Sequence, residues 1–152
     1  MSSGGYVLLV AVLAALAFGV YRAMVDGRFR GTHRIRGAVE AEREMSADVT
    51  SVLAGTPWSE QLGERATFLQ FSSAFCAPCR ATRRILEDVV AETPGVAHVE
   101  VDAEHHLELV RRLGVLRTPT TLVLDGAGVE VTRAAGAPTK AQVQAAIAAL
   151  TG

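Results

Sequence analysis

The stretch ATFLQFSSAFCAPC, residues 66–79, decides the fold. Its first half, Ala66–Ser72, is a short apolar run with aromatic side chains between Gly63 and a serine pair, a pattern typical of a buried strand. The cysteine pair Cys76 and Cys79 follows at once and begins a helical pattern. The stretch therefore predicts a strand that leads directly into a C-x-x-C motif at a helix N-terminus.

Further helix and strand patterns follow one another along the rest of the chain. Apolar residues recur at helical or strand spacing in segments separated by turn residues. The expected elements are, in order, a helix ending at Thr93-Pro94-Gly95, a strand Val96–Asp102, a helix Glu104–Leu113, two hairpin strands Thr120–Leu124 and Val129–Arg133, and a helix Thr139–Leu150 capped by Thr139. The order β-α-β-α-β-β-α predicts an α/β fold, in which helices flank a central mixed sheet that is parallel first and antiparallel at its end.

Composition excludes several classes of protein. At 152 residues the chain has room for one domain and a short appendage. With 15 basic and 16 acidic residues the net charge is -1, so the overall charge does not favour a nucleic-acid partner. Both cysteines belong to the C-x-x-C motif, which excludes a structural disulfide framework and a four-thiolate zinc site.

The N-terminal segment is apolar and uncharged from Ser2 to Tyr21, and a helix of that length would just cross a hydrocarbon core of about 30 Å. We interpret residues 1–5 as a tail and residues 6–25 as a transmembrane anchor in contact with the lipid bilayer. The alternative is a cleaved signal peptide, because Ala15-Leu16-Ala17 resembles a cleavage site. The absence of Lys and Arg before the apolar run argues against that alternative.

Charge asymmetry around this span favours a cytoplasmic C-terminal side, with an extracytoplasmic domain as the alternative. No Lys or Arg precedes the span, and several arginines follow it closely: Arg22, Arg28, Arg30, Arg34 and Arg36. We interpret residues 26–50 as a basic juxtamembrane linker, or as a helix over Ala38–Ala47. Residues 51–152 are then the folded domain of a single-pass membrane protein.

The motif Cys76-Ala77-Pro78-Cys79 suits thiol–disulfide exchange. At a helix N-terminus, unpaired N–H groups and the positive end of the helix dipole favour the thiolate of Cys76 and lower its pKa. The second sulfur lies one helical turn on, so Cys79 can resolve a mixed disulfide formed at Cys76. Pro78 suits the first turn, where its missing N–H is not required.

Three segments resemble the thioredoxin family. Residues 75–80 (FCAPCR) are similar to the family's Trp-Cys-Gly-Pro-Cys-Lys segment, Thr118-Pro119-Thr120 to its cis-proline loop, and residues 136–140 (GAPTK) to the turn before its last helix. The resemblance covers about Ala66 to Leu150 and implies a thioredoxin-like fold, here of the membrane-anchored bacterial type. It also implies disulfide-containing client proteins and a dithiol electron donor as partners, and no cofactor beyond the redox-active disulfide Cys76–Cys79.

The resemblance further implies a substrate-binding groove. A cis Pro119 would expose the backbone of Thr118 to an extended client strand beside Cys76. The alternative is an ordinary trans proline ahead of a strand. Phe75 stands where the family has a tryptophan, and Ala77 replaces its glycine, so the family's reduction potential and substrate preference do not carry over.

A proton acceptor for Cys79 has to be sought elsewhere than in the family. The family's buried aspartate, six residues before its first cysteine, is replaced by Gln70, which cannot take a proton. We consider His98 as the substitute, because it shares a strand face with Val96 and Glu100 beside the Gln70 strand, and Gln70 could orient it. A hydrogen-bonded structural histidine is the alternative.

No metal site is expected. His105 and His106 are the residues that suggest one, but adjacent side chains on a helix point about 100° apart. They cannot both bind one ion together with the cysteines.

These patterns favour a membrane-tethered enzyme that reduces protein disulfides at its C-A-P-C motif. Two alternatives are kept. If the domain faces outward, an extracytoplasmic disulfide oxidase or isomerase is expected. If the cysteines do not turn over, the groove at Thr118 and Pro119 would serve a thioredoxin-like binding module at the membrane.

Overall fold

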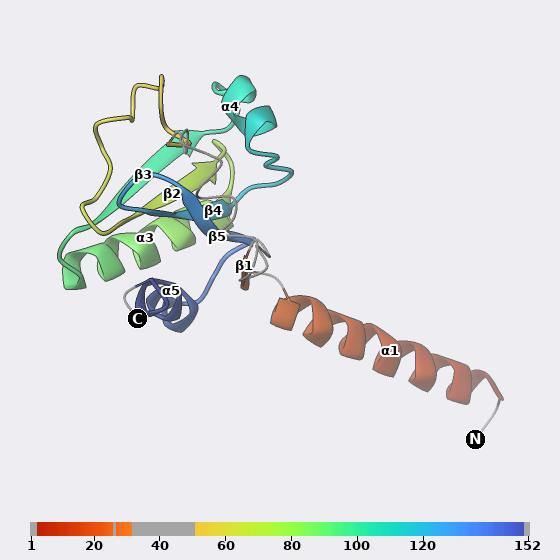
Figure 1. Ribbon diagram of the computed structural model, residues 1–152. Coiled ribbons are helices and arrows are strands. Elements are labelled where there is room, and N and C mark those ends of the chain that lie inside the picture. The colour runs from red at the N-terminus through yellow and green to blue at the C-terminus, as the bar shows by residue number, and fades with distance from the viewer. Residues whose placement is uncertain (1–2, 26, 32–50, 151–152) are drawn as a thin grey trace, which may run out of the picture.

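The computed structural model describes residues 3–25, 27–31 and 51–150, and Figure 1 shows their arrangement. In chain order the helices and strands are α1 (Ser3–Val25), β1 (Phe29–Gly31), β2 (Ala66–Ser72), α3 (Ala77–Glu92), β3 (Val96–Asp102), α4 (Leu107–Arg112), β4 (Thr120–Asp125), β5 (Glu130–Ala135) and α5 (Lys140–Ala148). From β2 onward the order is the expected β-α-β-α-β-β-α. The predicted α/β fold with a mixed sheet is therefore confirmed.

The strands form one sheet in the order β1-β5-β4-β2-β3. β2 and β3 are parallel, and the other neighbouring pairs are antiparallel. Helices α3 and α5 pack against one face, while α4 and the turns after residue 51 pack against the other. This arrangement brings the C-terminal end of β2, where the cysteine motif follows, next to the start of β4.

Strand β2 is the centre of the core. Phe68 belongs to the apolar cluster under α3 and α5, whereas Leu69 and Phe71 belong to the cluster on the α4 side. Side chains alternate between the two faces of a strand, so a strand covered on both faces carries apolar residues at successive positions. All three side chains are fully buried. A one-residue slip would exchange the two faces, so this packing specifies the register of the strand that carries the cysteine motif.

Several element boundaries differ from the expected ones, and an aspartate explains two of the later starts. The helix expected at Glu104–Leu113 begins later, because the carboxylate of Asp102 accepts the N–H of residue 104 at 2.8 Å and stabilises a turn there. The strand expected at Val129–Arg133 also begins and ends later. There the carboxylate of Asp125 accepts the N–H of residue 129 at 2.9 Å and extends the hairpin turn.

Within residues 26–50, interpreted above as a linker, Phe29–Gly31 instead form strand β1, which pairs antiparallel with β5. Just before β1, the N–H of Gly27 donates to the carbonyl of Ala135 at 3.0 Å. Gly27 has a φ of 76° and packs so closely on the backbone of Ala137 that a Cβ would collide with its carbonyl, so only glycine fits there. The chain after α1 is thus part of the sheet. The alternative helix over Ala38–Ala47 lies outside the described residues.

Helix α1 has none of its apolar window, Gly4–Arg22, buried against the rest of the described chain. Figure 1 shows it extending away from the domain near β1. Its length and mean hydropathy are sufficient to cross a membrane, and a signal sequence near an N-terminus has the same properties.

Candidate active site

The cysteines form a disulfide at the N-terminus of α3. Cys76 is the N-cap residue and is partly exposed, whereas Cys79, one turn into the helix, is 2% exposed. Ala77 and Pro78 lie between them on the surface, with the proline in the first turn as expected. One sulfur is therefore accessible to a partner, and the other is shielded by the helix.

Backbone N–H groups of the first turn of α3 point at both the sulfur and the backbone carbonyl of Cys76. The N–H of Cys79 lies 3.1 Å from the Sγ of Cys76, and the carbonyl of Cys76 accepts the N–H of Arg80 at 3.3 Å. The N–H of Cys76 in turn donates to the carbonyl of Ser73 at 3.3 Å, which closes the loop after β2. An N–H directed at sulfur stabilises negative charge there, so this geometry favours a thiolate on Cys76 once the disulfide is reduced.

The loop before β4 lies against the cysteine loop. The Thr118–Pro119 peptide bond is cis. The hydroxyls of Thr118 and Ser73 are 3.0 Å apart in a hydrogen bond, and the carbonyl of Pro119 accepts the N–H of Gly136 at 2.8 Å. The structure thus brings Thr118 and Pro119 to the end of the sheet that carries Cys76, as the sequence led us to expect.

Two large apolar side chains stand on the surface of these loops. Phe75, directly before the first cysteine, is 100% exposed, and Leu116, three residues before Pro119, is 96% exposed. The sequence pointed to Phe75 but not to Leu116. A single leucine in a loop carries no periodic signal, so only the structure shows that it lies unburied near the disulfide.

Gln70 lies fully buried beneath the disulfide. Its amide nitrogen donates to the carbonyl of Cys79 at 3.0 Å, and its amide oxygen lies 3.1 Å from Nε2 of His98. A carbonyl can only accept a hydrogen bond, so the NH₂ group of Gln70 must face Cys79 and its oxygen must face His98. Consequently Nε2 of His98 carries the hydrogen, and the lone pair of the neutral ring is on Nδ1.

His98 therefore contacts the residue expected to orient it. The ring reaches Gln70, and Gln70 reaches the backbone carbonyl of Cys79 rather than its sulfur. Burial lowers the pKa of His98 below its ordinary value of 6.5, because desolvation disfavours the imidazolium, although the charges of Glu100 and Glu87 act in the opposite direction. The ring is accordingly neutral at pH 7.

A cavity of about 380 Å³ opens beside Cys79. Its lining comprises Ser72, Ser73, Ala74, Cys79, Arg80, Arg83, Glu100 and Asp102. The Glu100 carboxylate accepts a hydrogen bond from Arg83 at 3.2 Å within this lining. The sequence placed Glu100 on the same strand face as His98 but gave it no role; strand alternation indicates the face, whereas the cavity depends on how α3 packs.

A family model described as thioredoxin matches residues 49–149, about two thirds of the chain. The match includes every element from β2 to α5. The chain belongs to the thioredoxin family. Its cysteine pair, proline loop and helix N-terminus are thus those of a thioredoxin domain.

Two curated proteins are similar to this thioredoxin domain. Human thioredoxin domain-containing protein 2 is 33% identical over 61 residues, which is 40% of this chain but only 11% of the human protein. Rice thioredoxin H5 is 28% identical over 94 residues, which is 57% of this chain and 70% of the rice protein. The similarity to the human protein is therefore confined to a small part of that protein.

Solved structures support the same fold. Thioredoxin f from spinach chloroplast superposes with a TM-score of 0.56 at 24% identity, over 68% of this chain and 93% of the spinach chain. Thioredoxin from Fasciola hepatica superposes with a TM-score of 0.52 at 24% identity, over 74% of this chain and 92% of the Fasciola chain. At these identities the comparison concerns the fold alone.

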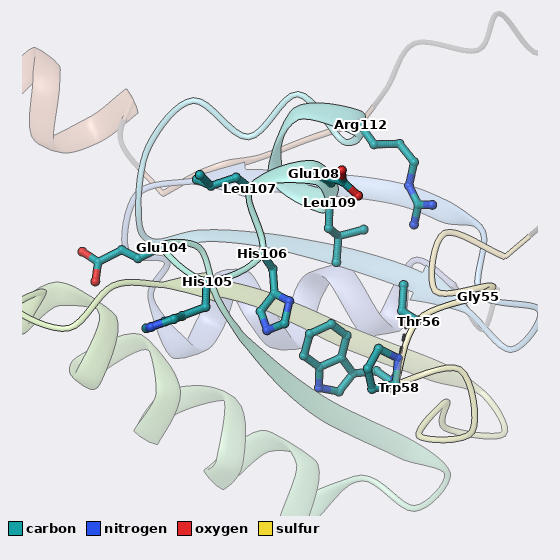
Figure 2. Close-up of a pocket in the computed structure, with 11 residues that line it drawn as sticks. Gly55, Thr56, Trp58, Glu104, His105, His106, Leu107, Glu108, Leu109 and Arg112 are labelled. Carbon is teal, nitrogen blue, oxygen red and sulfur yellow. Dashed lines mark hydrogen bonds between the residues drawn. The ribbon is translucent and has the colours of Figure 1, made fainter.

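A second cavity of this thioredoxin domain, about 520 Å³, lies between α4 and the turn at residues 55–58. Figure 2 shows Trp58 and His106 facing one another across it, with their rings 4.7 Å apart edge to face. His105 points elsewhere and binds the carboxylate of Asp102 at 2.8 Å. Within the described residues, no three His, Cys, Asp or Glu side chains are grouped to hold a metal ion.

The lowered pKa of His98 predicts a pH dependence of stability. The unfolded chain takes up a proton near the ordinary histidine value of about 6.5, before the folded chain does, so the free energy of unfolding should fall as the pH drops below 6.5. His98→Asn should flatten the curve between about pH 6.5 and pH 5, above the range in which most carboxylates titrate. Urea unfolding of the full chain in detergent at a series of pH values measures this. An unchanged slope in the variant would contradict a partly buried His98 that is neutral in the folded chain.

Proposed function

We propose that the chain is a membrane-tethered thiol–disulfide oxidoreductase that reduces disulfides of client proteins. The observation that carries the proposal is the unequal exposure of the two sulfurs: Cys76 is accessible at the N-cap of α3, and Cys79 is buried one turn below it. An accessible sulfur at a helix N-terminus suits nucleophilic attack, and a shielded neighbour suits intramolecular resolution.

The exchange has two steps, starting from the reduced pair. The thiolate of Cys76 attacks one sulfur of a client disulfide, so that a mixed disulfide forms, the client bond breaks and one client thiolate leaves with a proton from solvent. Cys79 then loses its proton and attacks the Sγ of Cys76, which forms the Cys76–Cys79 disulfide and releases the second client thiolate. Two electrons and two protons pass to the client, and a dithiol donor must return them to the enzyme.

The loop at Thr118 and Pro119 supports client binding beside Cys76. Backbone groups of the loop before β4 lie at the same end of the sheet as the exposed sulfur, where an extended client segment could pair with them. The exposed ring of Phe75 adds apolar contact surface next to the disulfide. A client would thus be held in an extended conformation across the exposed sulfur.

The proton of Cys79 has two candidate acceptors. His98 is neutral and partly buried, but its Nε2 hydrogen is directed to Gln70, so only Nδ1 can accept a proton. Glu100 shares with Cys79 the lining of the 380 Å³ cavity, which gives a carboxylate and water access to the buried cysteine. We propose His98 as the acceptor, and Glu100 as the second candidate.

The roles of the cysteines are tested by trapping. Cys79→Ser should accumulate mixed disulfides with clients through Cys76, because the resolving step is removed while attack remains. Cys76→Ser is the matched control and should trap none. Non-reducing electrophoresis of both variants from the same cells measures the adducts, and trapping by Cys76→Ser alone would reverse the assignment.

Turnover by the unmodified chain separates the enzyme from a binding module. With dithiothreitol as donor, the chain should accelerate insulin reduction above the uncatalysed rate, and both cysteine variants should not. A binding module would show only the background rate in all three proteins.

The proton acceptor is tested by comparing His98→Asn with Glu100→Gln. The single-turnover rate at which the reduced enzyme is oxidised by a client disulfide should fall by roughly tenfold or more at neutral pH in the variant that lacks the acceptor. We expect this fall, with the acidic limb of the pH–rate profile moved to higher pH, in His98→Asn and a near-normal profile in Glu100→Gln. The opposite pattern would identify Glu100, and two unchanged profiles would mean that solvent takes the proton.

The direction of the chemistry depends on the side of the membrane. Five arginines after the apolar span and none before it support a cytoplasmic domain, in which a pair of ordinary potential would be kept reduced and act as a reductant. A membrane-impermeant maleimide, applied to intact cells after mild reduction, should label Cys76 only when the cells are lysed. Labelling in intact cells would favour the oxidase or isomerase alternative.

A further inference from the structure

The anchor joins the domain at the end of the sheet where β2 leads into the cysteine loop. Phe29 is the register partner of Ala134, Ala134 pairs with Thr121, and Thr121 pairs with Gln70, so the start of β1 lies in the same row as the last residues of β2. β2 continues from there into the cysteine loop. The chain therefore arrives from α1 on the side of the sheet from which Cys76 projects, and Figure 1 shows α1 outside the β1 and β5 end of the sheet.

One carbonyl links this connection to the proline loop. The oxygen of Ala135 accepts the N–H of Gly27 at 3.0 Å and a guanidinium hydrogen of Arg117 at 2.6 Å. Gly27 is two residues beyond the end of α1, and Arg117 is directly before Thr118. The anchor and the client-binding loop are thus held by the same acceptor.

The connection is also short. Gly27 is five residue steps beyond Arg22, at the end of the apolar span, which limits the separation of the two Cα atoms to about 17 Å. Three strand spacings of about 4.8 Å, or about 14 Å in all, separate β1 from β2. The end of the apolar span is therefore held close to the end of β2 that leads into the cysteine loop.

The end of the sheet that faces this way carries exposed apolar and basic side chains, beside the carboxylate of Asp102. Phe75 and Leu116, with 100% and 96% of their surface exposed, are the most exposed large apolar side chains among the described residues outside α1. Exposed arginines stand on the same edge, at Arg28 before β1 and at Arg80 after the cysteines. Apolar side chains between cationic ones suit an interface of anionic phospholipids.

We propose that this end of the sheet rests on the lipid surface, with Phe75 and Leu116 at the level of the headgroups, where the ring of Phe75 can contact both lipid and a client segment that lies in the same layer. The proposal rests on the proposed function in one respect, since it requires α1 to cross the membrane. Cys76 then faces the bilayer rather than the bulk solvent. Its clients are disulfides of membrane proteins held within a short distance of the same surface, and the reduction of freely diffusing proteins is a slower, secondary reaction.

Tryptophan quenching by nitroxide-labelled lipid tests the proposal. In a Trp58→Phe background, the full chain is reconstituted in vesicles of phosphatidylcholine and phosphatidylglycerol, some of which carry a nitroxide near the headgroup end of an acyl chain. Phe75→Trp and Leu116→Trp should each lose about half or more of their emission, because an interfacial side chain lies at the depth of the label. The two probes are independent, so a folding defect in one leaves the other informative.

Two further variants provide controls. Ala127→Trp places the probe in the exposed turn between β4 and β5, at the opposite end of the sheet from the disulfide, and should keep its emission. Leu13→Trp lies in the middle of α1, and quenching of this probe by a second set of vesicles, with the nitroxide near the methyl end of the acyl chain, reports whether the anchor is inserted. Quenching of Leu13→Trp without quenching at positions 75 and 116 would overturn the proposal and leave the anchor in place. Equal quenching at position 127 would overturn the proposed orientation. An unquenched Leu13→Trp would overturn both the anchor and this proposal, whereas insulin reduction tests the redox activity separately.

Discussion

The hydrogen bond from the Gln70 amide to the Cys79 carbonyl ties the helix that carries the cysteines to the middle of the sheet. A buried amide must keep both of its ends satisfied, so the demand of the Cys79 carbonyl for a donor also determines what the other end of Gln70 can bind. That end requires a donor, and His98 on the neighbouring strand supplies it. Helix α3 and strands β2 and β3 are thereby joined by one side chain beneath the disulfide.

Strand order then assembles the rest of the site around this junction. Because β4 is antiparallel to β2, its first residue lies beside the last residues of β2, and the loop before it meets the cysteine loop. The hydroxyl pair of Ser73 and Thr118 connects the two loops directly. Residues more than forty positions apart in the chain thus form one surface, in which the rigid elements hold the reactive loops.

Local patterns predicted the parts of the fold that depend on local sequence. The bounds of β2 and β3 agree with the expected ones. β2 shows the continuous apolar run of a strand buried on both faces, and β3 alternates polar and apolar residues from His98 onward and begins after a turn. The shared face of Gln70 and His98 followed from strand alternation, and the two side chains do meet. The tautomer of His98 could not be predicted, since it depends on the position of a carbonyl in a different element.

Strand β1 escaped prediction for a related reason. Three residues with an arginine in the middle show neither apolar alternation nor length, and their partner strand lies about a hundred residues further along the chain. Likewise, the exposure of Leu116 depends on the path of a loop over the surface.

The pairing of β1 with β5 also covers backbone groups of β5 that another copy of the domain could bind. Without β1, the outer side of β5 would be an edge with free N–H and C=O groups, ready to pair with the same edge of another copy. A form of the domain that begins at residue 51 would expose the whole of this side of β5, whereas in one that begins at Gly27 the three residues of β1 cover Thr132–Ala134. Residues 29–31 thus shorten the free length of β5 at which two copies of the domain could join sheet to sheet.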